Sequence, residues 1–320
     1  MNDYVGYPPK KKRSKKPLLI IAIVLALLFL ALMIAIPLSV MPSFLGRRYE
    51  QEQYEATDYG IAAERIDLTS DDDLSIAAWR CRAEDAKGTV IILSGIQNPS
   101  VTAFFGYVKL LADNGWDSLL IEMRARSESE GEEIGLGMTE WLDVKAGADF
   151  LSADADAKGL PIVAMGTSMG GGTVIIAAGE LPEIDAVISL SAFSSWSDLF
   201  ADYMTRGGAP RFVSALDVPF VNMYLGFHFG FDLLPYSPLN GMAKLGERPI
   251  LMMHSTEDSQ VSYSQFEKLL AVADKNDIDV RTFIREGDEH FLCYPQYIDD
   301  PAQDVAFSTA ILDFLQANFP

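Results

Sequence analysis

The chain has 320 residues, which is enough for one large α/β domain or two small ones, and its formal net charge is −20. Residues 1–48 hold eight of the 25 Lys and Arg residues but only one of the 45 Asp and Glu residues, so the rest of the chain is strongly acidic. An acidic surface repels nucleic acid, and two cysteines are too few for a disulfide scaffold, so neither class of protein is indicated.

The N-terminal region carries a membrane signal. Nineteen apolar residues run without interruption from Leu18 to Ile36, and a helix of that length spans about the hydrocarbon thickness of a bilayer. Six Lys or Arg residues precede this run and only two follow it closely. The positive-inside rule therefore predicts a cytoplasmic basic segment at 1–16 and a transmembrane signal anchor at 17–41, with the remainder outside the cytoplasm.

A cleaved signal peptide is the alternative interpretation of this region. Its apolar core is usually about 7–15 residues long and ends at a small-residue cleavage site, and no persuasive site follows Ile36. A buried core helix would show a polar face, which this run lacks. We therefore expect a retained single-pass anchor in the cell membrane, a polar tether at 42–59 and a folded domain at 60–320.

Strands and helices alternate through most of residues 60–320. Strands are expected at 61–68, 74–82, 89–93, 116–123, 160–165, 184–190, 249–253 and 280–284, and helices at 101–114, 138–153, 262–275 and 304–318. This alternation predicts a mostly parallel sheet with helices on both faces, opened by one antiparallel pair. Residues 194–247 break the pattern and form an insertion without clear strands.

A candidate nucleophile follows the expected strand at 160–165. The sequence Gly166-Thr167-Ser168-Met169-Gly170 has the form of a nucleophile elbow, a tight strand-to-helix turn that presents a serine. The turn strains the backbone of Ser168 and crowds its neighbours, which explains the glycines two residues before and two after it. The pentapeptide alone is a weak signal, so the rest of the chain must supply a base and an acid.

The base is found by elimination among three histidines. A serine hydroxyl needs a base within hydrogen-bond reach, and the base needs an acid that fixes its tautomer. In folds with an elbow the chain order is Ser, Asp or Glu, His. Asp258 and His290 satisfy this order, and both follow the ends of strands on the sheet edge that carries Ser168. Glu257 competes with Asp258 as the acid.

The two other histidines are assigned structural roles. His254, beside the acid loop, is expected to support that loop, and His228, in the aromatic insertion, is expected to pack.

The developing oxyanion requires two backbone donors. One is the N–H of Met169, directly after the nucleophile, and the second is assigned to Ile96 in the loop Ser94-Gly95-Ile96-Gln97-Asn98. The chain has no HExxH, paired-cysteine, GxGxxG or P-loop motif, so no metal and no cofactor are predicted.

With these residues in place, the chain resembles the α/β-hydrolase superfamily over residues 60–320. It is similar to membrane-anchored serine hydrolases of the serine-aminopeptidase-like and Bem46-like branches. The stretch from Glu122-Met123-Arg124 to Ser129-Glu130-Gly131, followed by Glu140 and Asp143, is similar to the pattern DxRxHGxSxG…E..D of these branches, with Glu122 in place of the first Asp. The resemblance implies an eight-stranded α/β-hydrolase fold with a helical cap at about 194–247, and structural roles for Arg124 and Asp143.

The chain departs from that pattern at several positions. The usual His-Gly pair before the oxyanion loop is Ser94-Gly95, and the His-Gly pair inside the arginine stretch is Arg126-Ser127. The resemblance also implies that the second strand lies at one edge of the sheet and the last strand at the other. Cys81 and Cys293 would then be far apart, so two free thiols are expected.

Eleven aromatic residues lie between positions 193 and 236. They either form an apolar acyl pocket, which could face a membrane, or pack short cap helices onto the sheet.

Three functions follow from the sequence. The first is a membrane-anchored serine hydrolase of esters or thioesters that acts on a small or lipid-like acyl substrate. The second is an aminopeptidase-like serine peptidase, which needs cap carboxylates to hold the substrate ammonium. The candidates for these carboxylates are Asp198, Asp202, Asp217 and Asp232. The third is a non-catalytic membrane-tethered module, which the intact triad order disfavours.

Overall fold

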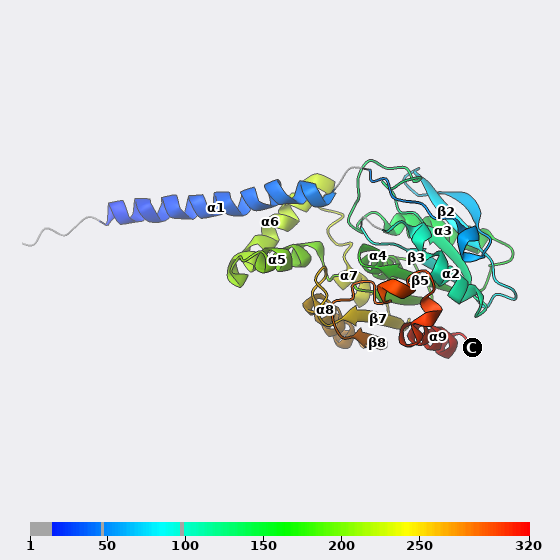
Figure 1. Cartoon of the computed structure of the whole chain (residues 1–320). Coiled ribbons are helices and arrows are strands. Elements are labelled where there is room, and N and C mark those ends of the chain that lie inside the picture. The colour runs from blue at the N-terminus through cyan, green and yellow to red at the C-terminus, as the bar shows by residue number, and fades with distance from the viewer. Residues whose placement is uncertain (1–14, 46–47, 97–98) are drawn as a thin grey trace, which may run out of the picture.

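The computed structural model describes residues 15–45, 48–96 and 99–320 (Figure 1). Most of the predicted basic segment, residues 1–14, lies outside the described residues. So do Gln97 and Asn98 of the predicted oxyanion loop.

An eight-stranded sheet forms the centre of the described structure, in the order β1-β2-β4-β3-β5-β6-β7-β8. Its strands are β1 (Glu64–Thr69), β2 (Ser75–Cys81), β3 (Thr89–Leu93), β4 (Asp117–Ile121), β5 (Ile162–Thr167), β6 (Ala186–Leu190), β7 (Ile250–Ser255) and β8 (Val280–Arg285). β2 pairs antiparallel with both β1 and β4, and all other pairs are parallel. The predicted mixed, mostly parallel sheet is confirmed.

One expectation about the sheet edge is wrong. β1, and not β2, is the edge strand, because the tight turn between them folds β1 back onto the outer side of β2. Cys81, at the end of β2, is therefore one strand inside the edge. Cys81 and Cys293 are nevertheless both free, as expected, and burial raises the pKa of each thiol to about 12.

Helices cover both faces of the sheet and create two apolar cores. The alternation of a pleated strand is visible in β3, where Ile91 and Leu93 enter one core while Val90 and Ile92 enter the other. The first core also receives α3 (Trp141–Ala153), α4 (Met169–Glu180) and α8 (Tyr263–Lys275), and the second receives α2 (Phe105–Ala112) and α9 (Val305–Asn318). Short 3₁₀ turns are η1 (Ala56–Tyr59), η2 (Val101–Phe104), η3 (Pro295–Tyr297) and η4 (Pro301–Gln303).

The insertion after β6 is helical, with α5 (Trp196–Arg206), α6 (Arg211–Phe229) and α7 (Pro238–Ala243). α7 packs against α4, whereas α5 and α6 pack together as a hairpin. In Figure 1 this hairpin projects from the sheet domain on the side from which the N-terminal helix leaves.

The N-terminal helix α1 (Lys16–Leu45) is long and apolar enough to cross a membrane. Within its candidate span, Lys16–Ser43, the most apolar 18-residue window has a mean hydropathy of 3.4, and 6% of that window is buried. The last turns of α1 contact α6, and Met33 and Met41 are fully buried there.

The segment expected to be a tether is not a free linker. Its first residues are the end of α1, and residues 48–59 lie on the sheet domain. Tyr49 and Arg126 form an isolated parallel β-bridge through their backbones. The N–H of Gln51 donates to Ser127 Oγ at 2.9 Å, and Gln53 Nε2 donates to Glu122 at 3.2 Å. These hydrogen bonds give partners to polar groups on both segments. The sequence alone does not show that the two segments are neighbours.

Candidate active site

Ser168 occupies a strained turn between β5 and α4. Its φ of 57° and ψ of −116° lie outside the conformations that serine ordinarily adopts. A Cβ at position 166 would lie 2.3 Å from the carbonyl oxygen of Gly170, and a Cβ at position 170 would lie 2.4 Å from that of Ser94. The steric reason predicted for the two glycines is confirmed.

Asp258 and His290 meet at the ends of β7 and β8. His290 Nδ1 and Asp258 Oδ2 are 2.8 Å apart, and both side chains are buried. Glu257, the competing acid, is exposed. The geometry therefore pairs His290 with Asp258.

The Asp258 carboxylate is held by several donors. Its Oδ1 accepts from the backbone N–H groups of Gln260 and Val261, each at 2.8 Å. Burial acts to raise the pKa of Asp258, but the hydrogen bond from His290 and these backbone donors outweigh burial and keep the pKa below its ordinary value. Asp258 is thus an anion suited to orient an imidazole.

His254 supports this loop, in the role expected from the sequence. Its Nε2 is 2.9 Å from the carbonyl oxygen of Val261 and 3.8 Å from Asp258 Oδ2. Burial lowers the pKa of His254, which favours the neutral ring. His228 lies in the cap, stacked on Tyr224 and 2.9 Å from Glu133.

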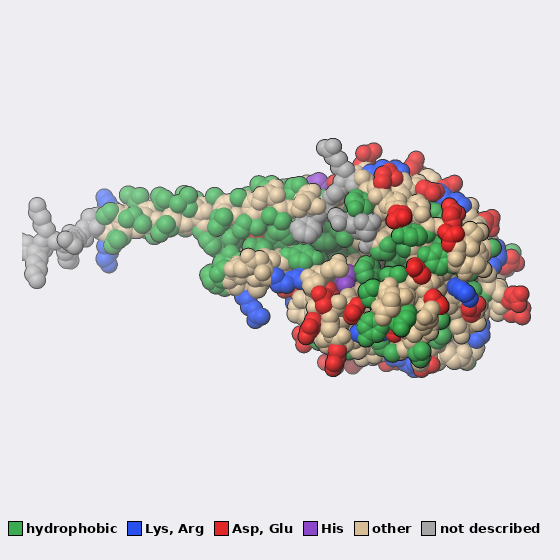
Figure 2. Space-filling model, in the orientation of Figure 1, with side chains coloured by type: hydrophobic (Ala, Val, Ile, Leu, Met, Phe, Trp, Pro, Cys, Tyr) green, Lys and Arg blue, Asp and Glu red, His purple; other side chains and the backbone are tan. Residues whose placement is uncertain are grey.

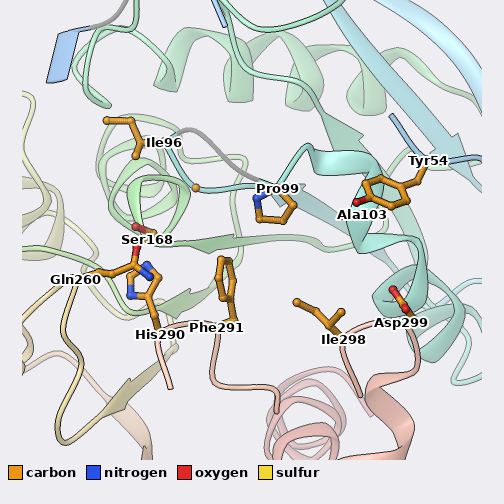
Figure 3. Close-up of a pocket in the computed structure, with 11 residues that line it drawn as sticks. Tyr54, Ile96, Pro99, Ala103, Ser168, Gln260, His290, Phe291, Ile298 and Asp299 are labelled. Atoms are coloured by element: carbon orange, nitrogen blue, oxygen red, sulfur yellow. The ribbon is translucent and has the colours of Figure 1, made fainter. Parts of the chain in front are cut away.

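A cavity of about 530 Å³ brings the candidate residues together (Figure 3). Ser168 and His290 both line it and lie next to each other in the view, and no direct hydrogen bond joins them among the described residues. Such contacts are often loose before substrate binds. The complete lining is Tyr54, Gly95, Ile96, Pro99, Ala103, Ser168, Gln260, His290, Phe291, Ile298 and Asp299.

The two predicted oxyanion donors flank the nucleophile. Met169 is the first residue of α4, where backbone N–H groups are free of helical partners, and Ile96 lines the cavity. Arg126, which the sequence marked only as a departure from a family pattern, lies behind both. Its Nη1 donates to the carbonyl oxygen of Gly95 at 2.6 Å, and its Nη2 is 3.9 Å from Met169 Sδ.

Arg124 and Asp143 are structural partners, as expected. Arg124 binds Asp143 through Nε at 3.0 Å and Nη2 at 2.8 Å, and it also pairs with Asp72. None of these three residues lines the cavity.

Several residues of the cavity were not found from the sequence. Tyr54 comes from the segment interpreted as a tether, and Asp299 comes from the loop between η3 and η4. No single motif links them to Ser168, because only the fold brings these distant segments together.

The cap contributes no residue to the lining of this cavity in the described structure. The aromatic insertion therefore does not form the wall of the pocket that holds Ser168. The packing alternative describes only part of it: Phe193 and Phe200 are buried, whereas Phe212, Phe227 and Phe231 are exposed. None of the four cap carboxylates lines the cavity either. Asp202 accepts from Gln265 Nε2 at 2.5 Å, and Asp198 pairs with Lys268 at 3.0 Å.

The described ranges contain no group of three or more His, Cys, Asp or Glu side chains placed to hold a metal ion.

Residues 135–319 match the profile of the prolyl oligopeptidase family, peptidase S9. Protein YqkD of Bacillus subtilis is 27% identical over 221 residues, which cover 68% of this chain and 70% of that protein. Protein YfhR of Salmonella typhi is 26% identical over 242 residues, which cover 71% of this chain and 74% of that protein.

Two solved structures share the fold. The esterase Pf2001 of Pyrococcus furiosus superposes with a TM-score of 0.66 at 18% identity, covering 85% of this chain and 99% of that chain. The acylaminoacyl peptidase of Pyrococcus horikoshii gives a TM-score of 0.60 at 17% identity, covering 81% of this chain and 42% of that chain. These similarities establish the fold of the chain.

Proposed function

This chain belongs to the prolyl oligopeptidase family of serine hydrolases, and from that premise we propose that it is a membrane-anchored hydrolase of carboxylic esters or thioesters. The observation that carries the proposal is the cavity in which a strained Ser168 lies beside His290, whose Nδ1 is held 2.8 Å from the buried Asp258 carboxylate.

The reaction follows from this arrangement. His290 Nε2 takes the proton of Ser168 Oγ as the oxygen attacks the substrate carbonyl carbon, and Asp258 fixes the tautomer that leaves Nε2 free to do so. The N–H groups of Met169 and Ile96 stabilise the oxyanion. The intermediate collapses, the leaving group departs with the proton from His290, and water activated by His290 hydrolyses the acyl-enzyme.

The walls of the cavity favour an acyl substrate. Ile96, Pro99, Phe291 and Ile298 are apolar and line the cavity, as expected for a site that takes a hydrocarbon chain. The P. furiosus neighbour is an esterase, which agrees with this substrate class.

A peptidase is the second candidate, because one carboxylate does line the cavity. Asp299 lies at the opposite end of the view from Ser168 in Figure 3, where it could bind a substrate ammonium group. The family description and the P. horikoshii neighbour are consistent with a peptidase. In this second candidate function, Asp299 from the loop between η3 and η4 takes the ammonium-binding role that the sequence analysis assigned to a cap carboxylate.

Packing of α1 supports a retained anchor over a cleaved signal peptide. Met33 and Met41 of α1 are only 0% and 1% exposed, and α1 contacts α6, so removal of α1 would uncover apolar surface on the domain. We propose that α1 spans the cell membrane with residues 1–16 in the cytoplasm. Protease added to intact cells should digest the hydrolase domain, and resistance to protease until the cells are lysed would contradict this orientation.

The mechanism is tested by covalent labelling with a fluorophosphonate probe. Wild type should label, Ser168→Ala should not, and Ser189→Ala should label like wild type because Ser189 is buried on the neighbouring strand outside the cavity. Equal labelling of Ser168→Ala would overturn the assignment of the nucleophile.

Substrate class is tested by comparing p-nitrophenyl acyl esters with aminoacyl anilides. The proposal expects ester cleavage to exceed anilide cleavage and to be unaffected by Asp299→Asn. Preference for anilides, together with a loss on Asp299→Asn, would establish the peptidase instead.

A further inference from the structure

The outward face of α6 is apolar. Residues spaced by three or four positions lie on one side of a helix, and this spacing joins Phe212, Leu216, Pro219, Met223 and Phe227. We call these five residues the α6 stripe. All five are exposed, with Phe227 76% and Phe212 66% accessible. At 1.5 Å per residue the stripe is about 22 Å long.

The inward face of α6 is mixed and includes the polar residues of the helix that are buried. It buries Ser214 and Asp217 together with Val221 and Leu225. Asp217 is the only Asp, Glu, Lys or Arg between positions 212 and 231, although 22% of the chain is charged. A helix on the surface of a water-soluble protein has its apolar side inward and its polar side outward, whereas α6 also has an apolar stripe on its outward side.

The α6 stripe is continuous with the surface of α1. A groove of about 310 Å³ between the helices is lined by Ile34, Pro37 and Leu38 from α1, and by Phe220, Met223, Tyr224, Phe227 and His228 from α6. Figure 2 shows apolar side chains along α1 and on the adjoining part of the hairpin.

The two helices run in the same direction. A second hollow, closer to the sheet domain, places Pro42 and Leu45 of α1 near Tyr224 and His228. Earlier residues of α6 therefore lie beside earlier residues of α1. The N-terminal half of α6 is thus farther from the sheet domain than its C-terminal half (Figure 1).

We propose that the α5–α6 hairpin is embedded in the bilayer leaflet nearest the hydrolase domain, with the α6 stripe against lipid acyl chains. The inference rests on the proposed membrane anchoring of α1. Ile34 and Leu38 line the same groove as residues of α6. Lipid that surrounds this part of α1 therefore also reaches the adjoining residues of α6. Amphipathic helices of this kind enter a membrane by about 5–10 Å.

Embedding the hairpin brings the active site to the membrane surface. Arg206, the last residue of α5, donates to the carbonyl oxygens of Ser259 and Gln260. These residues directly follow Asp258, and Gln260 lines the cavity that holds Ser168. The substrate class that this geometry selects is an amphiphilic ester that resides in the bilayer.

Depth-dependent fluorescence quenching tests the embedding. An environment-sensitive fluorophore is attached to full-length variants Leu216→Cys and Met223→Cys in phosphatidylcholine vesicles. Val305→Cys is the matched control, because Val305 is an apolar residue, 69% exposed, on α9, at a distance from α1 in Figure 1. Leu25→Cys reports on α1, and the unsubstituted chain gives the background of the two buried native thiols.

Labels at 216 and 223 should be quenched by lipids with brominated acyl chains to within about two-fold of the label at 25, and shielded from aqueous iodide. Iodide quenching equal to that at 305 would overturn the inference. Shielding from both quenchers that depends on protein concentration would also overturn it, in favour of a second copy on this face. Failure of the label at 25 alone would instead refute the anchor.

Substrate access is tested with the triple variant Leu216→Ser, Met223→Ser, Phe227→Ser. A short water-soluble ester should be cleaved as by wild type, while a long-chain fluorogenic ester dissolved in vesicles should be cleaved about five-fold more slowly or worse. Equal rates on the vesicle substrate would contradict the selection of bilayer esters. Absence of cleavage of both esters by wild type would refute the proposed hydrolysis and leave the quenching result standing.

Discussion

The segments after β5, β7 and β8, which carry Ser168, Asp258 and His290, differ from the cap helix α6 in the partners of their buried polar groups. In these segments the buried Asp258 carboxylate has three donors within 2.8 Å. In α6 the buried Asp217 carboxylate has no hydrogen-bond partner among the described residues, while phenylalanines are exposed outside. The difference teaches that one region holds a buried carboxylate in place with hydrogen bonds, as the proposed chemistry requires, whereas the other buries a carboxylate without a partner and exposes apolar side chains, as the proposed embedding requires.

The largest expected effect is that of a substitution at Asp258. Asp258→Asn should lower kcat by about 10²–10⁴, because the amide cannot hold His290 in the tautomer that accepts the Ser168 proton. Glu257→Gln is the matched control, since the neighbouring side chain is exposed, and it should leave kcat within about two-fold. Steady-state kinetics on a soluble ester measure both, and a larger loss in the Glu257 variant would reassign the acid.

The elbow should tolerate no added atom at position 170. Gly170→Ala places a methyl group 2.4 Å from the backbone carbonyl oxygen of Ser94, so we expect a loss of about 3 kcal/mol or more in unfolding free energy. Gly159→Ala is the control, because its φ is +81° but its surroundings are open, and it should cost about 1 kcal/mol. Denaturant unfolding in detergent compares the two, and equal losses would show that crowding is not the constraint.

Asp217 should make the stability of the chain dependent on pH. Burial raises the pKa of Asp217 to about 6 from an ordinary value of 3.8. Folding therefore penalises its ionised form, so the wild type loses stability as pH rises from about 4 to 6. Asp217→Asn should be indistinguishable from wild type below pH 4 and more stable by roughly 2–3 kcal/mol above pH 6.

The measurement is the difference in unfolding free energy between Asp217→Asn and wild type across pH 3.5–8. Taking the difference cancels the titration of the other carboxylates. A difference that does not change with pH would mean that Asp217 is as well solvated in the fold as in the unfolded chain.

The smallest effect is expected where α6 touches the segment between β4 and α3. His228 Nε2 and Glu133 lie 2.9 Å apart with about a third and almost half of their side chains exposed, and exposed pairs contribute about 0–1 kcal/mol. His228→Gln should therefore change unfolding free energy by less than about 1 kcal/mol and leave ester turnover unchanged. A larger loss would show that the cap depends on this contact for its position.

Local patterns in the sequence predicted much of the site. The two glycines around Ser168 follow from the crowding of one turn, and the Ser, Asp, His order limits the base to one of three histidines. Strands such as β3 were found because buried parallel strands are continuous apolar runs. These features depend on neighbours in the chain, which a sequence displays directly.

Contacts between distant segments could not be predicted in this way. Tyr54 and Asp299 line the cavity, and Arg126 holds the carbonyl oxygen of Gly95, through packing that no local pattern encodes. The place of β1 at the sheet edge belongs to the same class, because pairing order depends on the path of a turn and not on the composition of the strand.

By itself the sequence determined the apolar length of α1, the elbow and the alternation that builds the sheet, since each rests on periodicity or sterics within a few residues. Only the tertiary structure decided that the aromatic insertion stays out of the cavity and that α6 turns its apolar stripe outward beside α1. The physical reason is that burial depends on the neighbours of a residue in space. The same phenylalanine side chain can be buried in a core or exposed on a surface, and the sequence does not distinguish the two.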